Sequence, residues 1–291
     1  MKNARLSLRR ILVISRPFWW VNTAVPFAVG ALLAAKQIEP AVVVGFIYFL
    51  IPYNLLMYGV NDIFDYESDI KNPRKNGSVN GSVLPLELHG KLWWAMLLVN
   101  MPFVVYFLWI GTWASTLFLT VVLFMVFAYS QKGLRYKEKP LLDSFTSAFH
   151  YSSPFIFGIL LLQGEKLWLG IFAAFFLWVA ANHAFGAIQD IVPDRKAGIA
   201  SIATYLGSRQ TLYVVLTFYL AAATLPVFIY GPIGWFGALA ILPYLALVLR
   251  CLPERNNEKS KLFASSWRMF LAVNYIIGAI GSITLLYLYN R

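Results

Sequence analysis

The chain has 291 residues, of which 59% are hydrophobic and 13% are charged, and its mean hydropathy is +0.65. A soluble globular domain typically has a charged fraction of about 25%, so the composition excludes an ordinary soluble protein and indicates an integral membrane protein. The net charge of +11 is explained mainly by membrane topology and by attraction to anionic membrane lipids, and no nucleic-acid partner is expected.

Apolar runs that are long enough to cross a membrane follow one another along the whole chain. A hydrocarbon core of roughly 30 Å requires about 20 helical residues. We therefore expect an all-α membrane protein in which residues 1–291 form a single domain. The first run is not expected to be a cleaved signal peptide, because no small-residue cleavage site follows it. The nine predicted spans are residues 19–35, 41–60, 92–110, 112–130, 142–162, 167–188, 211–231, 233–250 and 269–289.

The basic residues predict how the chain is oriented. Of the 24 Lys and Arg residues, 21 fall on one side when alternate connections are assigned to opposite sides, and Lys36, Lys166 and Arg291 fall on the other. Short connections that are rich in Lys and Arg stay on the cytoplasmic side. The sequence therefore predicts a plasma-membrane protein with a cytoplasmic N-terminus and an external C-terminus.

The first acidic cluster follows the second predicted span. It contains Asn61, Asp62, Asp65 and Asp69 in a chain that has only 13 Asp and Glu residues. Residues four apart lie on one face of a helix, with Cβ atoms about 5–6 Å from each other. Asn61, Asp65 and Asp69 would therefore form one polar stripe, with Asp62 beside it.

A second acidic cluster, Asp190 and Asp194, follows the sixth predicted span on the same predicted side. Pro193 removes a backbone donor and disfavours helix at the residue before it, so the two carboxylates are expected at a helix end. Asp65-x-x-x-Asp69 and Asp190-x-x-x-Asp194 are each followed by basic residues, which suggests two helix ends that face one another.

Crowded carboxylates repel one another unless a cation neutralises them. Mg²⁺ prefers oxygen ligands and commonly shares a site between a few carboxylates and substrate phosphates. We therefore expect Asn61, Asp62, Asp65, Asp69, Asp190 and Asp194 to bind Mg²⁺ and, through it, a diphosphate. Arg and Lys residues grip phosphate oxygens, and the basic candidates for the diphosphate are Lys71, Arg74, Arg135, Lys137 and Lys196.

The spacing Asn61-x-x-x-Asp65-x-x-x-Asp69, the later Asp190-x-x-x-Asp194 and the nine predicted spans resemble the UbiA superfamily of intramembrane prenyltransferases. Ser15-Arg16-Pro17 and Tyr129-Ser130 add to the resemblance, whereas the family's usual Arg-Pro after the first motif is replaced by Pro73-Arg74. The resemblance implies a helical bundle around a central cavity that opens on the cytoplasmic side. It also implies Asp65, Asp69, Asp190 and Asp194 as catalytic residues, Arg16 and Tyr129 as substrate-binding residues, and an isoprenyl diphosphate as substrate.

The segments around Phe64-Asp65-Tyr66 and His183-Ala184-Phe185 are similar to the lycopene elongase subgroup. This similarity implies transfer of a five-carbon prenyl group from dimethylallyl diphosphate to lycopene through an allylic cation. Asn22 and His183, which are polar residues within spans, are expected to contact the acceptor, a water or the product cation; interhelical hydrogen bonds are the alternative role.

Three other functions remain open at the level of the residues. An aromatic quinone precursor or a polar lipid can replace the carotenoid as acceptor. A cation transporter is the non-enzymatic alternative, because acidic residues in membranes also mark ion pathways. Transport sites tend to lie near the bilayer midplane at broken helices, whereas these clusters lie at span ends on one predicted side, which favours the enzyme. The sequence predicts no particular oligomeric state.

Overall fold

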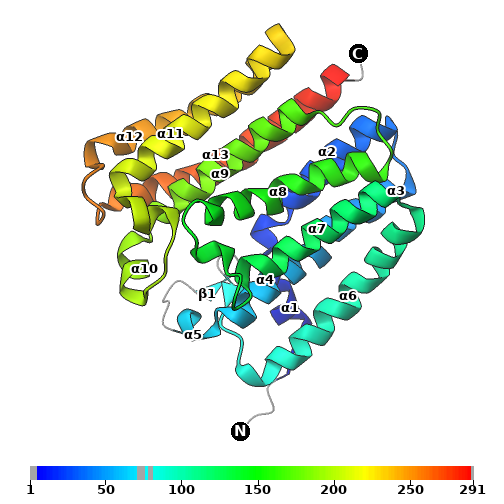
Figure 1. Ribbon diagram of the computed structural model, residues 1–291, viewed down its shortest axis with the longest axis horizontal. Coiled ribbons are helices and arrows are strands. Elements are labelled where there is room, and N and C mark those ends of the chain that lie inside the picture. Colours follow the sequence, from blue (N-terminus) through cyan, green and yellow to red (C-terminus); the bar gives the residue numbers. More distant parts are fainter. Residues whose placement is uncertain (1–4, 71–75, 78–80, 290–291) are drawn as a thin grey trace. The chain divides into compact units, whose positions relative to one another are not determined.

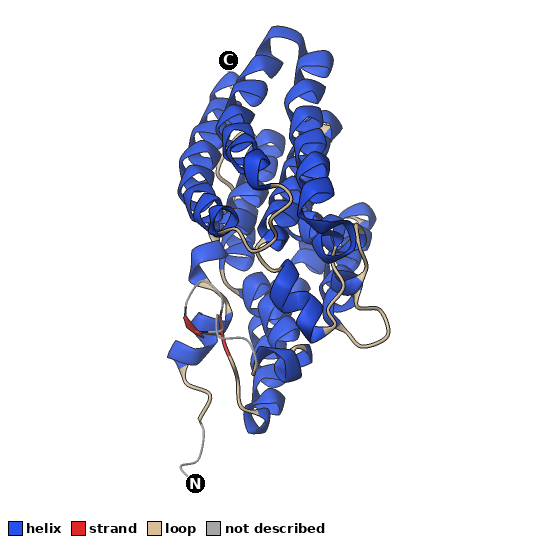
Figure 2. Ribbon diagram, turned by 90° about the vertical axis from the view of Figure 1, so that its left-hand side faces the viewer, coloured by secondary structure: helices blue, strands red, loops and turns tan. Residues whose placement is uncertain are grey.

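The computed structural model describes residues 5–70, 76–77 and 81–289, most of which lie in helices (Figures 1 and 2). The chain divides into two compact units. Unit 1 comprises Met1–Arg135 and Ser153–Leu167, and unit 2 comprises Tyr136–Ser152 and Trp168–Arg291. Within the described ranges, strand is confined to a short antiparallel pair, β1 (Asn76–Gly77) and β2 (Gly81–Ser82). The expected all-α class is confirmed.

Unit 1 is built mainly from apolar helices. Part of α8 belongs to this unit, because residues 153–161 of that helix lie in unit 1 and residues 142–152 lie in unit 2. The elements of unit 1 are α1 (Leu8–Ile14), η1 (Pro17–Trp19), α2 (Val21–Ala35), α3 (Pro40–Leu50), α4 (Pro52–Phe64), α5 (Tyr66–Asp69), η2 (Leu86–Leu88), α6 (His89–Ile110), α7 (Trp113–Ser130) and the C-terminal part of α8 (Leu142–Leu161).

The second predicted span, residues 41–60, is divided into two helices. Pro40 starts α3 and Pro52 starts α4, the position in a helix where the missing proline N–H costs no hydrogen bond. Ile51 lies between them with φ −121° and ψ −60°, outside helical geometry. The break gives α4 its own N-terminus within one apolar stretch and leads directly to the acidic cluster at its other end.

Aromatic rings form the core of unit 1. Phe49 packs against Phe27 with ring centroids 5.2 Å apart, and against Phe157 at 5.8 Å; Phe157 in turn packs against Phe107 at 5.3 Å. Gly30 permits the close approach of α2 and the C-terminal part of α8, because a Cβ at that position would collide with the carbonyl of Phe155. These contacts hold α2, α3, α6 and α8 around the start of α4.

Unit 2 contains long helices that run beside one another, with α11 packed against both α9 and α12 (Figure 1). Its core includes Tyr219, Tyr244 and Phe270, and the Tyr219 hydroxyl donates a 2.6 Å hydrogen bond to Oδ1 of Asn182. The elements are η3 (Tyr136–Glu138), the N-terminal part of α8, α9 (Leu169–Ile188), α10 (Ile191–Ala197), α11 (Ile202–Tyr230), η4 (Gly231–Ile233), α12 (Gly234–Cys251), η5 (Leu252–Glu254) and α13 (Lys261–Tyr289).

Helix α11 begins nine residues before the predicted span 211–231 and bends near its start. Ser201 and Thr204 form a capping box at its N-terminus, which explains why the helix extends into the predicted loop. Gly207 interrupts the helical geometry with φ 75° and ψ 167°. A residue with a side chain is strained at this φ, so glycine allows the kink.

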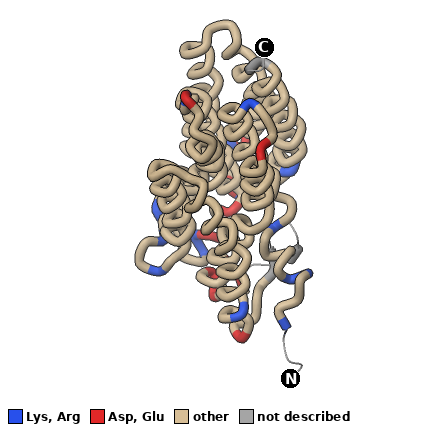
Figure 3. The backbone as a smooth tube through the Cα atoms, turned by 90° about the vertical axis from the view of Figure 1, so that its right-hand side faces the viewer, with Lys and Arg blue, Asp and Glu red and all other residues tan. Residues whose placement is uncertain are grey.

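Seven segments within the described ranges are long and apolar enough to cross a membrane. Two of them each include two helices: Pro40–Phe64 includes α3 and α4, and Ile202–Glu254 includes α11 and α12. Helix α8 is not among the seven. Figure 3 shows long stretches of helix without charged residues. The membrane character is therefore supported, whereas nine spans and a cytoplasmic cavity opening stay predictions.

Candidate functional site

The first acidic cluster lies where α4 ends and α5 begins. Asp65 is the C-terminal cap of α4, with φ −97° and ψ 2°. The backbone hydrogen bonds nevertheless continue through it, because the Asp65 amide donates to the carbonyl of Asn61 at 2.9 Å and the Asp69 amide donates to the carbonyl of Asp65 at 2.8 Å. The spacing of one turn between these residues, expected from the sequence, is therefore kept across the boundary between the two helices.

Asp65 lies between an amide and a guanidinium. Nδ2 of Asn61 donates to Oδ2 of Asp65 at 2.9 Å and to the Ser130 hydroxyl at 3.2 Å, which ties α4 to the end of α7. Nη2 of Arg135 lies 3.7 Å from Oδ1 of Asp65. The structure thus joins Arg135, from a separate predicted loop, to Asn61 and Asp65 of the predicted polar stripe, and it adds Ser130, which the sequence indicated only as part of the Tyr129-Ser130 motif.

Asp62 has a different environment from Asp65. Its Oδ1 accepts a 2.7 Å hydrogen bond from Nη2 of Arg16, and the two side chains are only 2% and 13% exposed. The guanidinium carbon of Arg16 lies 4.2 Å from the ring centroid of Tyr58, which adds a cation–π contact. Arg16 itself has a positive φ of 52°. The neutralising partner of Asp62 is therefore an arginine that the sequence analysis had assigned to substrate.

The second acidic cluster flanks the short helix α10. Asp190 occupies its N-cap position and Asp194 its first turn, and the Asp194 amide donates to the Asp190 carbonyl at 2.9 Å. The expectation of a helix end is confirmed, although Pro193 is accommodated inside α10 because the first turn of a helix tolerates proline. Carboxylates near a helix N-terminus are stabilised by the backbone N–H groups there.

A buried carboxylate that sequence reasoning missed organises the neighbourhood of His183. Asp143, in the first turn of α8, accepts from the backbone N–H groups of Ser144 at 2.7 Å and of Ile202 at 2.8 Å. The Ser144 hydroxyl lies 3.1 Å from Nδ1 of His183. Both Asp143 and Asp190 lie close enough to act electrostatically on that imidazole. The signal in the sequence was a lone carboxylate at the start of an apolar run.

The remaining predicted residues are distributed over both units. Lys71 and Arg74 lie outside the described residues. In unit 1, the structure places Asn22 in α2 and Tyr129 in the last turn of α7; in unit 2, it places Lys137 in η3 and Lys196 in α10.

The residues at the α4–α5 junction suit Mg²⁺. Two carboxylates one turn apart, Asp65 and Asp69, and the carboxamide of Asn61 provide hard oxygen donors, and Mg²⁺ usually keeps several waters and phosphate oxygens as its other ligands. Rotation of the Asn61 amide would turn its oxygen toward the metal. Within the residues that the structure describes, no three His, Cys, Asp or Glu side chains lie together closely enough to enclose a metal ion. A metal bound here would therefore need oxygen atoms of a substrate or waters to complete its coordination.

Relatives of this chain support a membrane enzyme. Residues 23–274 match the UbiA prenyltransferase family. The chain is 42% identical over 284 residues to a lycopene elongase/hydratase of Corynebacterium glutamicum, with 96% of this chain and 97% of the relative covered. It is 46% identical over 276 residues to a C(50) beta-cyclic carotenoids biosynthesis protein, LbtBC, of Dietzia sp., which covers 91% of this chain and 61% of that protein.

Solved structures with low sequence identity share the fold. A UbiA homolog from Archaeoglobus fulgidus bound to DMAPP and Mg²⁺ aligns with a TM-score of 0.71 at 19% identity, over 92% of this chain and 98% of that one. The apo structure of a UbiA homolog from Aeropyrum pernix aligns with a TM-score of 0.65 at 24% identity, over 94% and 98%. The match of residues 23–274 to the UbiA prenyltransferase family and the 42% identity to the relative from Corynebacterium glutamicum establish that the chain is a prenyltransferase of the UbiA family.

Proposed function

We propose that this prenyltransferase transfers a prenyl group from dimethylallyl diphosphate to lycopene or a related carotenoid in an Mg²⁺-dependent reaction. The observation that carries the proposal is the 42% identity, over almost the whole of both chains, to a lycopene elongase/hydratase. The structural relative from Archaeoglobus fulgidus that is bound to DMAPP and Mg²⁺ supports the choice of donor and metal. A related structure holds GPP and Mg²⁺, so longer donors are the alternative.

In unit 1, Asp65, Asp69 and Asn61 would hold Mg²⁺. One oxygen of Asp62 is already occupied by Arg16 at 2.7 Å, so the proposal assigns Asp62 to orient Arg16 and leaves coordination to the other three residues. Arg135 is 3.7 Å from Asp65, a looser contact from which the guanidinium can turn toward phosphate oxygens when a metal neutralises the carboxylate. Tyr129, Lys71 and Arg74 remain further candidates for the diphosphate.

In unit 2, Asp190 and Asp194 would hold Mg²⁺ from a second helix end. Lys137 and Lys196 are the basic residues of this unit that we assign to the diphosphate. His183 is held by Ser144 and stands within electrostatic reach of Asp143 and Asp190, so its imidazole is suited to accept a proton or orient a water. Asn22 of unit 1 is assigned to the acceptor.

Mg²⁺ held by Asn61, Asp65, Asp69, Asp190 and Asp194 would supply positive charge to the departing diphosphate. The bond between C1 of the donor and its bridging oxygen breaks, and the electron pair leaves with the diphosphate. The allylic cation then forms a carbon–carbon bond with the electron-rich polyene. The resulting cation on the acceptor either loses a proton to give an alkene or adds water, which then releases a proton to give an alcohol. The side chains contribute by orienting both substrates and by stabilising developing charge, which is commonly the largest catalytic effect.

The proposal includes the topology that the sequence predicts. Nine spans would place both acidic clusters at the cytoplasmic mouth of a central cavity in the plasma membrane, with residues 1–291 acting as one catalytic domain. Membrane lipids would supply the route by which a lipophilic acceptor enters. Reporter fusions after Asn256 and after Arg291 test the orientation, because the first should report a cytoplasmic position and the second an external one.

The central experiment supplies the two substrates to the purified protein. Full-length protein in carotenoid-containing vesicles is incubated with dimethylallyl diphosphate, lycopene and Mg²⁺, and the extracted carotenoids are analysed by mass spectrometry. We expect masses raised by one or two prenyl units, and no such product when a chelator removes the metal. A matched incubation with geranyl diphosphate decides donor length.

Other acceptors define the outcomes that contradict the proposal. If lycopene is unchanged while an aromatic acid or a polar lipid gains a prenyl group, the carotenoid assignment is wrong and the prenyltransferase assignment stands. Membership of a prenyltransferase family favours prenyl transfer, whichever acceptor is used, over cation transport. Uptake of Mg²⁺ into vesicles without prenyl transfer would reverse that preference.

A further inference from the structure

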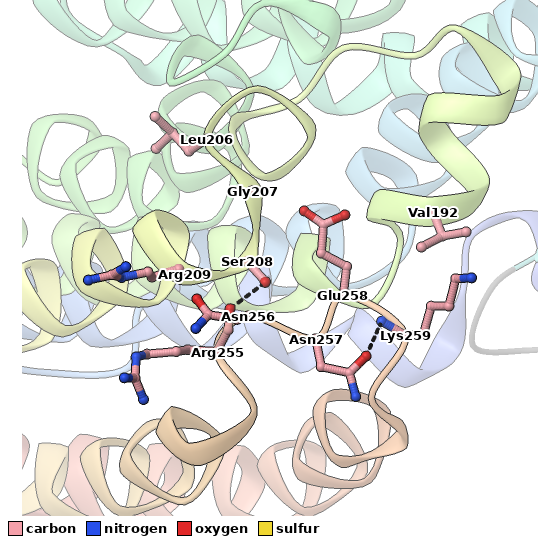
Figure 4. A pocket seen from close by; sticks show the side chains of 10 residues that line it. All are labelled: Val192, Leu206, Gly207, Ser208, Arg209, Arg255, Asn256, Asn257, Glu258 and Lys259. Atoms are coloured by element: carbon pink, nitrogen blue, oxygen red, sulfur yellow. Dashed lines mark hydrogen bonds between the residues drawn. The ribbon is translucent and has the colours of Figure 1, made fainter.

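Unit 2 contains a pocket that borders α10 through Val192 and is otherwise lined by residues outside the acidic motif; His183 does not line it. Its volume is about 420 Å³, and it lies between the start of α11 and the connection from α12 to α13 (Figure 4). The first segment stands at the start of the long apolar helix α11 and the second between the ends of α12 and α13, positions where a membrane protein meets the lipid headgroups. The residues that line the pocket are Val192, Leu206, Gly207, Ser208, Arg209, Arg255, Asn256, Asn257, Glu258 and Lys259.

Hydrogen bonds hold the two sides of this pocket together. The Ser208 hydroxyl donates to the Arg255 carbonyl at 2.6 Å, which joins the segment after the kink of α11 to the end of η5. On the other side, Arg195 pairs with Glu258 at 2.5 Å and also donates to the Thr204 carbonyl at 3.0 and 3.2 Å. The shape of the pocket therefore does not depend on a ligand.

The carboxylates around the pocket already have partners. Glu258 is neutralised by Arg195, and Glu254 accepts a 2.9 Å hydrogen bond from Nδ2 of Asn257. Arg209, Arg255 and Lys259 line the pocket, and none of the three forms an ion pair with any carboxylate in the described part of the chain. The pocket thus carries an excess of positive charge.

The two arginines are the residues best placed to bind an anion. Their side chains extend in the same direction in Figure 4. Arg255 donates from Nη1 to the Leu252 carbonyl at 3.0 Å, which holds its guanidinium in place. Like charges that share a pocket repel one another, and an anion between them removes this repulsion.

We propose that this pocket binds a phosphate group, with Arg209 and Arg255 as its principal ligands and Asn256, which lies beside Arg255 in Figure 4, as an additional donor. Arginine matches phosphate oxygens in a bidentate geometry, which favours phosphate over a simple halide. An anionic lipid headgroup and a free phosphate or diphosphate offer the same chemistry. The proposal does not depend on the identity of the prenyl acceptor.

The test uses the full-length protein in a neutral detergent with EDTA, so that binding through Mg²⁺ does not contribute. The midpoint of thermal unfolding is followed while short-chain phosphatidylglycerol, short-chain phosphatidylcholine, inorganic phosphate or inorganic diphosphate is added. A greater stabilisation by phosphatidylglycerol than by phosphatidylcholine identifies a lipid headgroup as the source. Stabilisation by the inorganic anions alone identifies a free phosphate.

The Arg209→Gln/Arg255→Gln double variant tests the site itself. We expect its apparent affinity for the active probe to fall about a hundredfold, since each charge-assisted contact is worth about tenfold. Arg268→Gln, which removes an exposed arginine of the same unit that does not line the pocket, is the matched control and should retain wild-type affinity. Equal losses in both, or no loss in the double variant, would overturn the proposal.

A second pair of variants covers the case in which the double variant does not fold. Asn256 is exposed, so Asn256→Asp should fold normally while it places a carboxylate beside the phosphate. Asn256→Ala removes the same amide without adding charge. We expect Asn256→Asp to bind the probe at least about tenfold more weakly than Asn256→Ala. Equal affinities of these two variants would exclude a phosphate at this position.

Discussion

Arg16 and Asp62, which are 46 residues apart in sequence, form a buried ion pair with a 2.7 Å hydrogen bond from Nη2 to Oδ1. The pair connects the turn before α2 to the last turns of α4, where the acidic motif begins. Tyr58, one turn before Asp62, covers the guanidinium at 4.2 Å. Asp62 therefore has an internal counter-ion, unlike a carboxylate that depends on a metal for neutralisation.

Removal of Arg16 should destabilise the protein. In Arg16→Gln, the Asp62 carboxylate stays buried without its cation, a change that typically costs about 3–5 kcal/mol. Because the charge imbalance is the cause, the double variant Arg16→Gln/Asp62→Asn should recover part of this loss. The unfolding of wild type, Arg16→Gln, Asp62→Asn and the double variant in the same detergent provides a double-mutant cycle, which measures the interaction free energy of the pair. Additive losses would show that the pair contributes nothing as a pair.

Asp65 and the nearby Glu67 of α5 allow a matched test, because both are carboxylates in the same short segment and only Asp65 is assigned to the metal. Asp65→Asn should lower prenyl transfer by about a hundredfold or more. The variant lacks a negative charge that would hold Mg²⁺, and the departing diphosphate depends on that metal for stabilisation. Glu67 is exposed and should tolerate Glu67→Gln without loss of turnover. Turnover is measured with saturating donor and titrated Mg²⁺. An Asp65→Asn enzyme with wild-type turnover would remove Asp65 from the metal site.

Sequence reasoning recovers local features of the fold better than long-range contacts. It predicts the one-turn spacing of Asn61, Asp65 and Asp69 because i, i+4 geometry is a property of any helix. It does not predict the break at Ile51, since α3 and α4 together read as one continuous apolar stretch. It also misses the Arg16–Asp62 pair, because pairing over 46 residues depends on how helices pack.

The dependence of long-range contacts on helix packing also explains why the sequence does not reveal the role of Asp143 in unit 2. Asp143 joins the start of α8 to the start of α11, a contact across 59 residues that no local pattern encodes. The capping box of Ser201 and Thr204 is local and was readable in principle, but the polar residues around it favoured a loop. As a result, the predicted span 211–231 begins later than α11 does.

Asp143 should matter for stability because it satisfies two backbone donors at once. The residue is fully buried, and Asp143→Ala would leave the amides of Ser144 and Ile202 without an acceptor. An unsatisfied buried group costs about 1–3 kcal/mol, so we expect a total loss of about 2–6 kcal/mol in the free energy of unfolding. Glu165→Ala is the control, because this exposed carboxylate should change stability by less than about 0.5 kcal/mol. Similar unfolding midpoints for the two variants would contradict the assignment.

His183 should influence what happens to the acceptor cation after transfer. If its imidazole accepts the proton or orients the water, His183→Gln should lower turnover by about a hundredfold, within the usual range for a general base, and change the ratio of deprotonated to hydrated product. Ser144→Ala keeps the imidazole but removes its 3.1 Å partner, so a smaller change in the same direction is expected. Tyr219→Phe removes a different hydrogen bond of unit 2, to Asn182, and should affect stability while the product ratio stays constant. Chromatographic separation of the two products provides the measurement, and a ratio that shifts equally in Tyr219→Phe would assign His183 a structural role only.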